Sequence, residues 1–238
     1  MLMSVIRVKF LKGEQVKYIS HLDLMRTVIR VIRRAHIPVA YSQGFNPHQE
    51  ISFGAPLPLG VTSEAEYVDI KMAEDFEPEV LVETFNKNAP EGIKMISGII
   101  LRPGTKSAMA LVTHSEYVLS LVLPKKSDLI NELNEKFKEF LELEEITVVK
   151  FNKKTKVEKK LNVRPLIIKC KFEEPTEKEA ILLGNEQEGV VIFRCLLKSG
   201  NTDNVKPELV VGAFASFIST DINVRRIHRT ELYLSEIV

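Results

Sequence analysis

Cysteine is scarce in this sequence and tryptophan is missing. Cys170 and Cys195 are its two cysteines, and there is no tryptophan in 238 residues. Two thiols so far apart exclude a disulfide framework, and they exclude an iron–sulfur cluster, which needs three thiolates in close spacing. We therefore expect each cysteine to be a small buried hydrophobic residue in a reduced protein.

Long apolar runs are also missing. No stretch approaches the roughly 20 apolar residues that a membrane-spanning helix needs. The first residues, MLMSVIRVKF, lack the charged start followed by an apolar centre that marks a signal peptide. Both absences predict a soluble, cytoplasmic protein with no membrane partner.

A strong net charge is the third absence, because Lys and Arg number 33 and Asp and Glu number 32. The charge is nevertheless uneven along the chain. Residues 1–50 hold eight Lys or Arg against three acids. A basic patch inside a neutral protein indicates a local anionic partner rather than general binding to nucleic acid.

The first half of the chain alternates strand and helix patterns. Apolar and basic side chains alternate over residues 5–11, which predicts a strand with one solvent-exposed face. Ser20 is a good N-cap for the next helix, Asp23 takes the capping-box position, and Pro38 ends that helix. The elements predicted after it are strands at 39–41 with 51–53, at 65–72 and at 93–101, and a helix from Pro78 to about 88. This βαββαβ order is typical of a ferredoxin-like domain.

The second half repeats a similar order after a turn-rich break at 102–107. Its predicted elements are a strand at 116–123, a helix capped by Ser127, a strand at 146–151, a turn at 152–155, a strand running to about 172, a strand at 190–197, a helix at 207–218 and a strand at 224–234. The sequence thus predicts an α+β protein of two ferredoxin-like halves with antiparallel sheets, residues 1–103 and 112–238.

Residues 20–60 combine the clearest amphipathic helix with a loop rich in Gly, Pro, Asn and His. The most distinctive segments are SHLDLMR at 20–26, RRA at 33–35, YSQGFNPH at 41–48, PLPLG at 56–60 and EYVD at 66–69. With them the chain resembles an uncharacterised family of radical-SAM-linked proteins, known as a domain of unknown function. The resemblance implies a bacterial protein encoded beside, or fused to, a radical SAM enzyme, and it supplies no established activity. With two cysteines, this chain is not itself a radical SAM enzyme.

The helix and the loop after it supply candidate substrate-binding residues. Arginine presents a planar fork of donors that suits phosphate, and single-stranded RNA also needs aromatic surfaces for stacking, which Tyr18, Tyr41, Phe45 and Phe53 offer. The candidates for binding RNA or another phosphate-bearing substrate are Arg26, Arg30, Arg33, Arg34, Tyr41, Ser42, Gln43, Phe45, Asn46 and His48. The competing interpretation is a solvated basic face whose arginines pair with acids such as Asp23, Glu64 and Glu66.

His21, His48 and Asp23 are the candidates for catalysis. Two histidines can serve as acid and base in the cleavage of an RNA phosphodiester. Together with a carboxylate, they also suffice for a divalent metal, with Glu50, Glu66 and Asp69 as further ligand candidates. No compact ligand motif is present, so we expect no metal site and no cofactor. The simpler interpretation is that His21 caps the helix and His48 orders its own loop.

These observations favour an accessory protein of a radical SAM enzyme that binds RNA or another phosphate-bearing substrate through residues 20–60. Two alternatives stay open. One is an endoribonuclease or phosphotransfer enzyme that uses His21 and His48. The other is a protein-docking module for the radical SAM partner.

Overall fold

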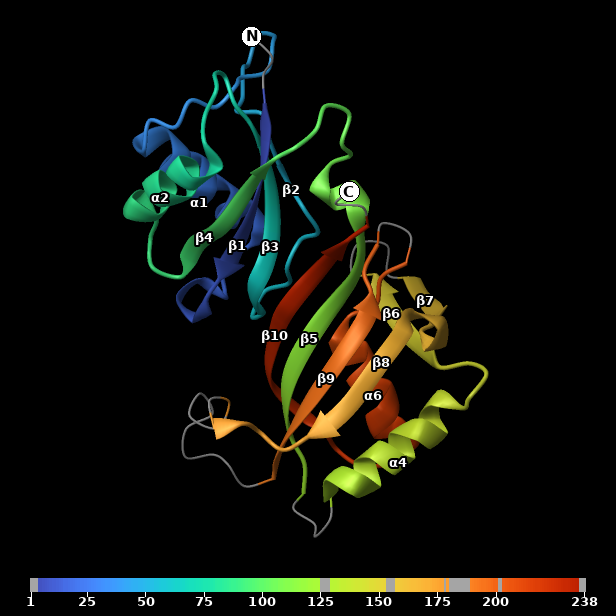
Figure 1. The fold of residues 1–238 in the computed structure, drawn as a ribbon. Coiled ribbons are helices and arrows are strands. Elements are labelled where there is room, and N and C mark those ends of the chain that lie inside the picture. The colour runs from blue at the N-terminus through green and yellow to red at the C-terminus, as the bar shows by residue number, and fades with distance from the viewer. Residues whose placement is uncertain are drawn as a thin grey trace. The chain divides into compact units, whose positions relative to one another are not determined.

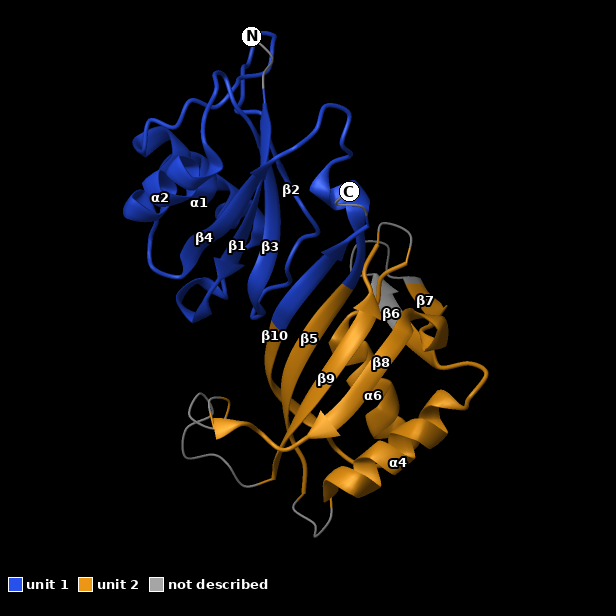
Figure 2. Cartoon of the chain, in the orientation of Figure 1, with its two compact units in different colours: residues 1–114, 229–238 blue, residues 115–228 orange. Residues whose placement is uncertain are grey.

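The computed structural model describes residues 4–124, 129–152, 157–177, 179, 189–200 and 203–235. The chain forms two compact units, residues 1–114 with 229–238 and residues 115–228 (Figure 2). Two long strands, β5 (Val112–Val122) and β10 (Asn223–Leu234), contribute residues to both units.

The first unit follows the predicted βαββαβ order. Its elements are β1 (Val5–Lys12), η1 (Glu14–Val16), α1 (His21–Arg34), β2 (Ile51–Phe53), β3 (Thr62–Lys71), α2 (Pro78–Asn88), β4 (Ile93–Ile100) and the short α3 (Ala108–Leu111). Strand β1 pairs antiparallel with β3 and with β4, and β2 pairs antiparallel with β3. Helices α1 and α2 lie on the same side of these strands (Figure 1).

The core of the first unit forms between those helices and one face of the sheet. Side chains alternate across a strand, so Ile6 and Val8 of β1 share a face with Val68 and Ile70 of β3. All four are fully buried. The apolar stripe of α1 packs against them through residues that recur every three or four positions: Leu24, Val28, Val31 and Ile32.

The opposite face of β1 is half-buried, and Arg7 in its middle is fully buried, which corrects the prediction of a solvent-exposed face. Arg7 is 2% exposed. Its Nη2 donates to the carbonyl of Lys106 at 2.8 Å, and its cross-strand neighbour Asp69 accepts a hydrogen bond from the backbone N–H of Ala108 at 2.8 Å. The segment that leads into α3 therefore covers this face at Arg7 and Asp69 and takes both charged side chains out of water.

The second unit is built around phenylalanine. Its elements are α4 (Leu129–Leu141), β6 (Thr147–Asn152), β7 (Val157–Asn162), η2 (Arg164–Leu166), β8 (Ile167–Glu173), β9 (Val190–Lys198) and α6 (Pro207–Phe217), with the shared parts of β5 and β10. The ring of Phe137 on α4 lies 4.9–5.7 Å from those of its neighbours on β8, β9 and α6, measured between centroids, and those neighbours are Phe172, Phe193 and Phe214. Such aromatic contacts hold helices and strands together in one core.

The α+β class is confirmed, but the structure does not show two separate ferredoxin-like halves. In the described part of the chain the strands form one eight-stranded sheet in the order β4-β1-β3-β10-β5-β9-β8, with β2 on β3, and a separate pair β6-β7. The strand predicted to run to 172 is interrupted at η2, because Pro165 has no N–H to give to a ladder. The predicted cap Ser127 and residues 153–155 of the predicted turn lie outside the described residues.

Candidate functional site

Helix α1 begins as the sequence predicted. The Ser20 hydroxyl accepts a hydrogen bond from the backbone N–H of Asp23 at 3.1 Å and lies 2.7 Å from the carboxylate of the same residue. The hydrogen bond that the Ser20 hydroxyl donates to this carboxylate lowers the pKa of the exposed Asp23 carboxyl, and Arg26, 3.2 Å away, lowers it further. Asp23 thus serves the start of the helix and holds one of the four candidate arginines.

His21 lies beside the sheet. Its ring stacks edge-on against Phe53 with centroids 5.8 Å apart. Burial lowers the pKa of His21, and the positive charge of Lys12 lowers it further against the opposing pull of Glu66. The imidazole is therefore neutral near pH 7. Phe53 is 6% exposed, so it packs into the core and offers no stacking surface to a ligand.

The four candidate arginines of α1 are all exposed, but they differ in their contacts. Arg26 pairs with Asp23, and Arg34 donates to the carbonyl of Asn88 on α2. The guanidinium groups of Arg30 and Arg33 make no hydrogen bond or ion pair with any described residue. Glu66, one of the acids proposed to neutralise this face, is buried against Arg229 at 2.8 Å instead. Two guanidinium groups on this face thus remain available to an anion.

The loop after α1 is a closed turn. The Ser42 N–H donates to the carbonyl of His48 at 2.9 Å, the His48 N–H donates to the Ser42 hydroxyl at 3.1 Å, and that hydroxyl lies 2.8 Å from Nδ1 of His48. Gly44 at its tip has φ +129°, a conformation that side chains rarely allow. Its neighbour Phe45 is fully exposed, at 106% of the reference area.

This turn and the C-terminal end of α1 lie at the same end of the first unit. Val39 bridges to Met72, Ala40 donates to the carbonyl of Lys71, and Lys71 donates to that of Glu50, so the chain on both sides of the turn is bonded to the C-terminal end of β3. Arg33 is in the last turn of α1. We therefore place the exposed arginines and the turn at one end of the unit.

His21 and His48 are not brought together. His21 contacts Phe53, at the far end of β2, whereas His48 comes before β2 begins. Strand β2 lies between the two histidines, so the structure offers no shared site in which they act as acid and base. No group of three or more His, Cys, Asp or Glu within the described ranges is placed to hold a metal ion.

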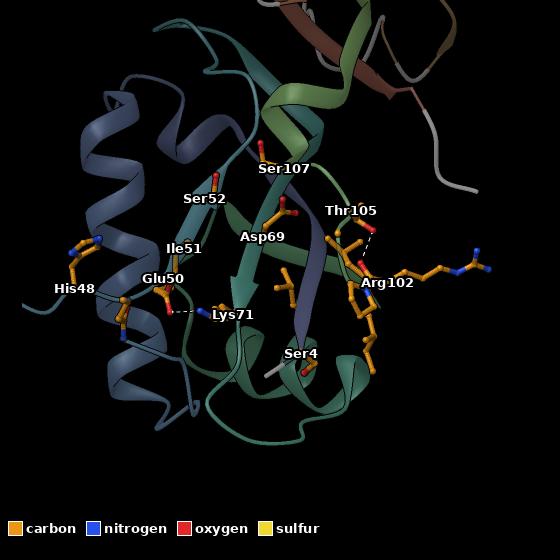
Figure 3. Close-up of a pocket in the computed structure, with 16 residues that line it drawn as sticks. Ser4, His48, Glu50, Ile51, Ser52, Asp69, Lys71, Arg102, Thr105 and Ser107 are labelled. Carbon is orange, nitrogen blue, oxygen red and sulfur yellow. Dashed lines mark hydrogen bonds and ion pairs between the residues drawn. The ribbon is translucent and has the colours of Figure 1, made fainter. Parts of the chain in front are cut away.

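A cavity of about 610 Å³ lies on the face of the sheet opposite α1. Its walls come from the start of β1 and the residue before it, the start of β2 and the three residues before it, the end of β3 and the 100–107 segment: Ser4, Val5, His48, Gln49, Glu50, Ile51, Ser52, Asp69, Lys71, Ile100, Leu101, Arg102, Pro103, Gly104, Thr105 and Ser107. Figure 3 shows Ser52, Asp69 and Ser107 grouped on one side, while the side chains of His48 and Arg102 extend away from the others.

Both carboxylates in the cavity wall have a cationic partner. Asp69 accepts from Nε and Nη2 of Arg7 at 2.7 and 2.9 Å, and Lys71 donates to Glu50 at 2.8 Å. Of these residues the sequence had suggested Asp69 and Glu50 as metal ligands, and the structure gives each carboxylate a cationic partner instead. Sequence reasoning missed the cavity, because its walls are separated by up to about a hundred residues.

The family of the chain is shown by comparison with known proteins. Residues 5–207 match the family described as "Uncharacterized protein conserved in bacteria (DUF2344)", and the chain belongs to that family. The predicted resemblance to a bacterial family of unknown function is thereby confirmed. No curated protein matches the chain, and none of the described helices combines the length and apolar character needed to cross a membrane.

Solved structures resemble the chain at low sequence identity. A chain of a Cbf5-Nop10-Gar1 complex is 11% identical with a TM-score of 0.49, covering 96% of this chain and 48% of that one. A chain of an archaeal box H/ACA sRNP Nop10-Cbf5 complex is 10% identical with a TM-score of 0.44, covering 95% and 46%. An unknown protein from Galdieria sulphuraria is 7% identical with a TM-score of 0.26, covering 94% and 98%. The chain thus spans about half the length of the first two.

Proposed function

We propose that this protein binds single-stranded RNA through the exposed arginines of α1 and the turn of residues 41–48. The observation that carries the proposal is Phe45, an aromatic ring wholly exposed at the tip of a hydrogen-bonded turn. A fully exposed apolar ring buries no surface within the folded chain, whereas stacking of a nucleobase on it would remove that surface from water. Base–aromatic stacking contributes about 1–3 kcal/mol per base.

The arginines supply the second half of the interface. Arg30 and Arg33 are exposed and make no hydrogen bond or ion pair with a described side chain, so phosphate binding breaks none. A guanidinium presents two parallel N–H donors to phosphate oxygens, which a hydrated lysine does less well. Tyr41, the first residue of the turn, is 46% exposed and extends the stacking surface of Phe45. Gln43, Asn46 and His48 add exposed polar groups that suit base edges.

The family resemblance adds a partner to this proposal. We infer that the RNA, or another phosphate-bearing substrate, is presented to a radical SAM enzyme encoded beside or fused to this protein. The two cysteines of this chain cannot hold such an enzyme's cluster, so the redox chemistry belongs to the partner. Co-purification of the tagged protein with that enzyme tests the partnership. Ribonuclease treatment before purification separates this test from RNA binding, because a direct protein–protein contact persists when the RNA is digested.

Ultraviolet crosslinking in the native host, followed by recovery of RNA on the tagged protein, tests RNA binding. The double variant Arg30→Glu, Arg33→Glu is compared with Lys87→Glu, Lys94→Glu, which makes the same charge change at exposed positions on α2 and β4. We expect recovery of defined RNAs from the wild type and the lysine variant and its loss in the arginine variant. Equal background recovery from all three proteins would contradict the proposal.

The crosslinking experiment also separates the two alternatives. A docking module predicts that the arginine variant loses the radical SAM enzyme while RNA recovery stays at background. An endoribonuclease that uses His21 and His48 predicts RNA cleavage that either His→Ala change abolishes. The placement of these histidines at opposite ends of β2 does not support the second alternative.

A further inference from the structure

The cavity opposite α1 contains buried polar atoms that have no partner. Gln49 is 8% exposed and lines the cavity, and its Oε1 makes no hydrogen bond, while its Nε2 donates to the Tyr41 hydroxyl at 3.4 Å. If the amide is turned by half a rotation, the unpartnered atom is a nitrogen instead of an oxygen, so one polar atom lacks a partner in either orientation. The hydroxyl of Ser4, another lining residue, is also buried without a partner.

A buried polar atom without a partner is expensive, because it has lost its water and gained nothing in exchange. Two such atoms in the wall of one cavity indicate a ligand that hydrogen-bonds there. Ser52 and Ser107 add two hydroxyls that make no hydrogen bond with any described residue. The cavity thus presents several neutral hydrogen-bonding groups of both kinds.

The charges of the cavity argue against an anionic ligand. Lys71 in the wall is paired with Glu50, and Arg7 behind the wall is paired with Asp69, so these two cations have carboxylate partners. The Arg102 side chain points away from the hollow (Figure 3). A phosphate placed here would meet two carboxylates and no free cation within the walls. These charges favour a neutral ligand over an anionic one.

Much of the remaining wall is apolar. Val5, Ile51, Ile100, Leu101 and Pro103 line the cavity beside the polar groups. At about 610 Å³ the cavity has the size of sites that bury a small organic molecule, which typically measure roughly 300–1,000 Å³. Apolar walls with a few neutral donors and acceptors are what a protein uses to hold an unstacked nucleobase.

We propose that this cavity binds one nucleobase of the RNA held by α1 and the turn. The inference rests on the proposed function through His48, which closes the turn by its bond to Ser42 and also lines the cavity. The phosphates stay outside on Arg30 and Arg33, and a single unstacked base enters the neutral cavity, where its edge satisfies the Gln49 amide. The cavity would therefore read the identity of that base.

Nuclear magnetic resonance with isotope-labelled full-length protein tests this site without RNA. Adenosine, guanosine, cytidine and uridine are titrated separately, because each carries a base and no phosphate. We expect at least one of them to shift the backbone amide signals of Ser52, Lys71 and Thr105 in a saturable way. Absence of such shifts for all four nucleosides would overturn the inference.

Two variants and a matched control test whether the nucleosides bind in the cavity. Gln49→Leu removes the amide at nearly constant size and should weaken nucleoside binding about fivefold, as expected for one lost neutral hydrogen bond. Ser52→Trp places a large side chain at an exposed wall position and should abolish binding even if the Gln49 variant folds poorly. Gln15→Leu removes an exposed amide outside the cavity and should bind as the wild type does. Equal nucleoside affinity in Gln49→Leu, Ser52→Trp and the wild type would contradict the proposal.

Failure of the nucleobase site is distinguishable from failure of RNA binding. Anisotropy of a fluorescein-labelled single-stranded RNA is measured with the same proteins and with Arg30→Glu, Arg33→Glu. RNA binding that depends on the arginines without any nucleoside shifts would overturn the base site and leave the proposed function standing. Nucleoside binding at the cavity without RNA binding would overturn the placement of an RNA base there together with the proposed function.

Discussion

At the scale of single residues, the ion pair between Arg7 and Asp69 buries two opposite charges beside the cavity. Arg7 is 2% and Asp69 6% exposed, and the pair is bidentate. Removing one partner of a buried pair leaves the other as an uncompensated charge, which costs much more than the intact pair contributes. The intact pair therefore contributes to the stability of β1 on β3 beside the cavity.

Replacing Asp69 by Asn should lower the free energy of unfolding by about 3–5 kcal/mol, because the Arg7 guanidinium stays buried without its counter-charge. Urea denaturation followed by circular dichroism measures the change. Asp75→Asn, at an exposed position after β3, serves as the control and should change stability by less than about 0.5 kcal/mol. Equal midpoints for the two variants would show that the pair contributes nothing.

His21 gives the fold a dependence on pH. Burial lowers its folded-state pKa below the ordinary value of 6.5, so as the pH falls through that value the unfolded chain takes up a proton that the folded chain resists. Stability contributed by neutral His21 is present above pH 6.5 and is lost below it. His21→Gln should therefore lose less stability than the wild type between neutral and mildly acidic pH.

Thermal unfolding across that pH range measures the effect of His21→Gln. His36→Asn is the matched control, because His36 is exposed and asparagine tolerates its positive φ of 54°. The control should keep the pH dependence of the wild type. An unchanged profile in His21→Gln as well would mean that this imidazole titrates alike in the folded and unfolded chains.

At the scale of elements, α1 shows what the sequence could predict. Its N-cap Ser20, its apolar stripe and its exposed arginines are local features, and the structure has all of them. The contact of Arg34 with Asn88 on α2 was not predictable, because it joins residues 54 positions apart. Local patterns therefore identified the helix and its basic face, and only the fold separated Arg30 and Arg33 from the two engaged arginines.

The cavity shows what the sequence could not predict. Gln49 follows a turn and lies between polar neighbours, so nothing local indicates that it is buried. It lines the cavity together with segments near residues 4 and 100, and these segments come together only in the folded unit. The same holds for Arg7, which alternation placed on an exposed face until the segment leading into α3 covered it. The burial of both residues therefore depends on the folded unit and not on the local sequence.

At the scale of the whole molecule, the closing strand corrects the predicted architecture. The sequence assigned residues 224–234 to the second half, yet residues 229–238 group with the first unit. Within that unit Arg229 pairs with the buried Glu66, and Glu231 pairs with Lys9 at 2.6 Å. No local signal in a strand pattern says which strand it will pair with, since pairing depends on partners far away in the sequence.

The near-neutral charge of the whole chain makes the source of any RNA affinity easy to trace. With a formal net charge of +1, the protein as a whole attracts RNA little, so affinity must come from local groups. Each phosphate contact to a single strand contributes about 0.7 to the slope of log affinity against log salt concentration. The contribution of Arg30 and Arg33 is therefore measurable as a change in that slope.

RNA binding by α1 is tested by the salt dependence of anisotropy for labelled single-stranded RNA on the wild type, Arg30→Ala/Arg33→Ala and Lys87→Ala/Lys94→Ala. We expect binding that weakens with salt, a slope reduced by about 0.7 for each arginine removed, and no change in the lysine control. Wild-type RNA binding that is absent, or a slope that both double variants leave unchanged, would contradict the proposed function.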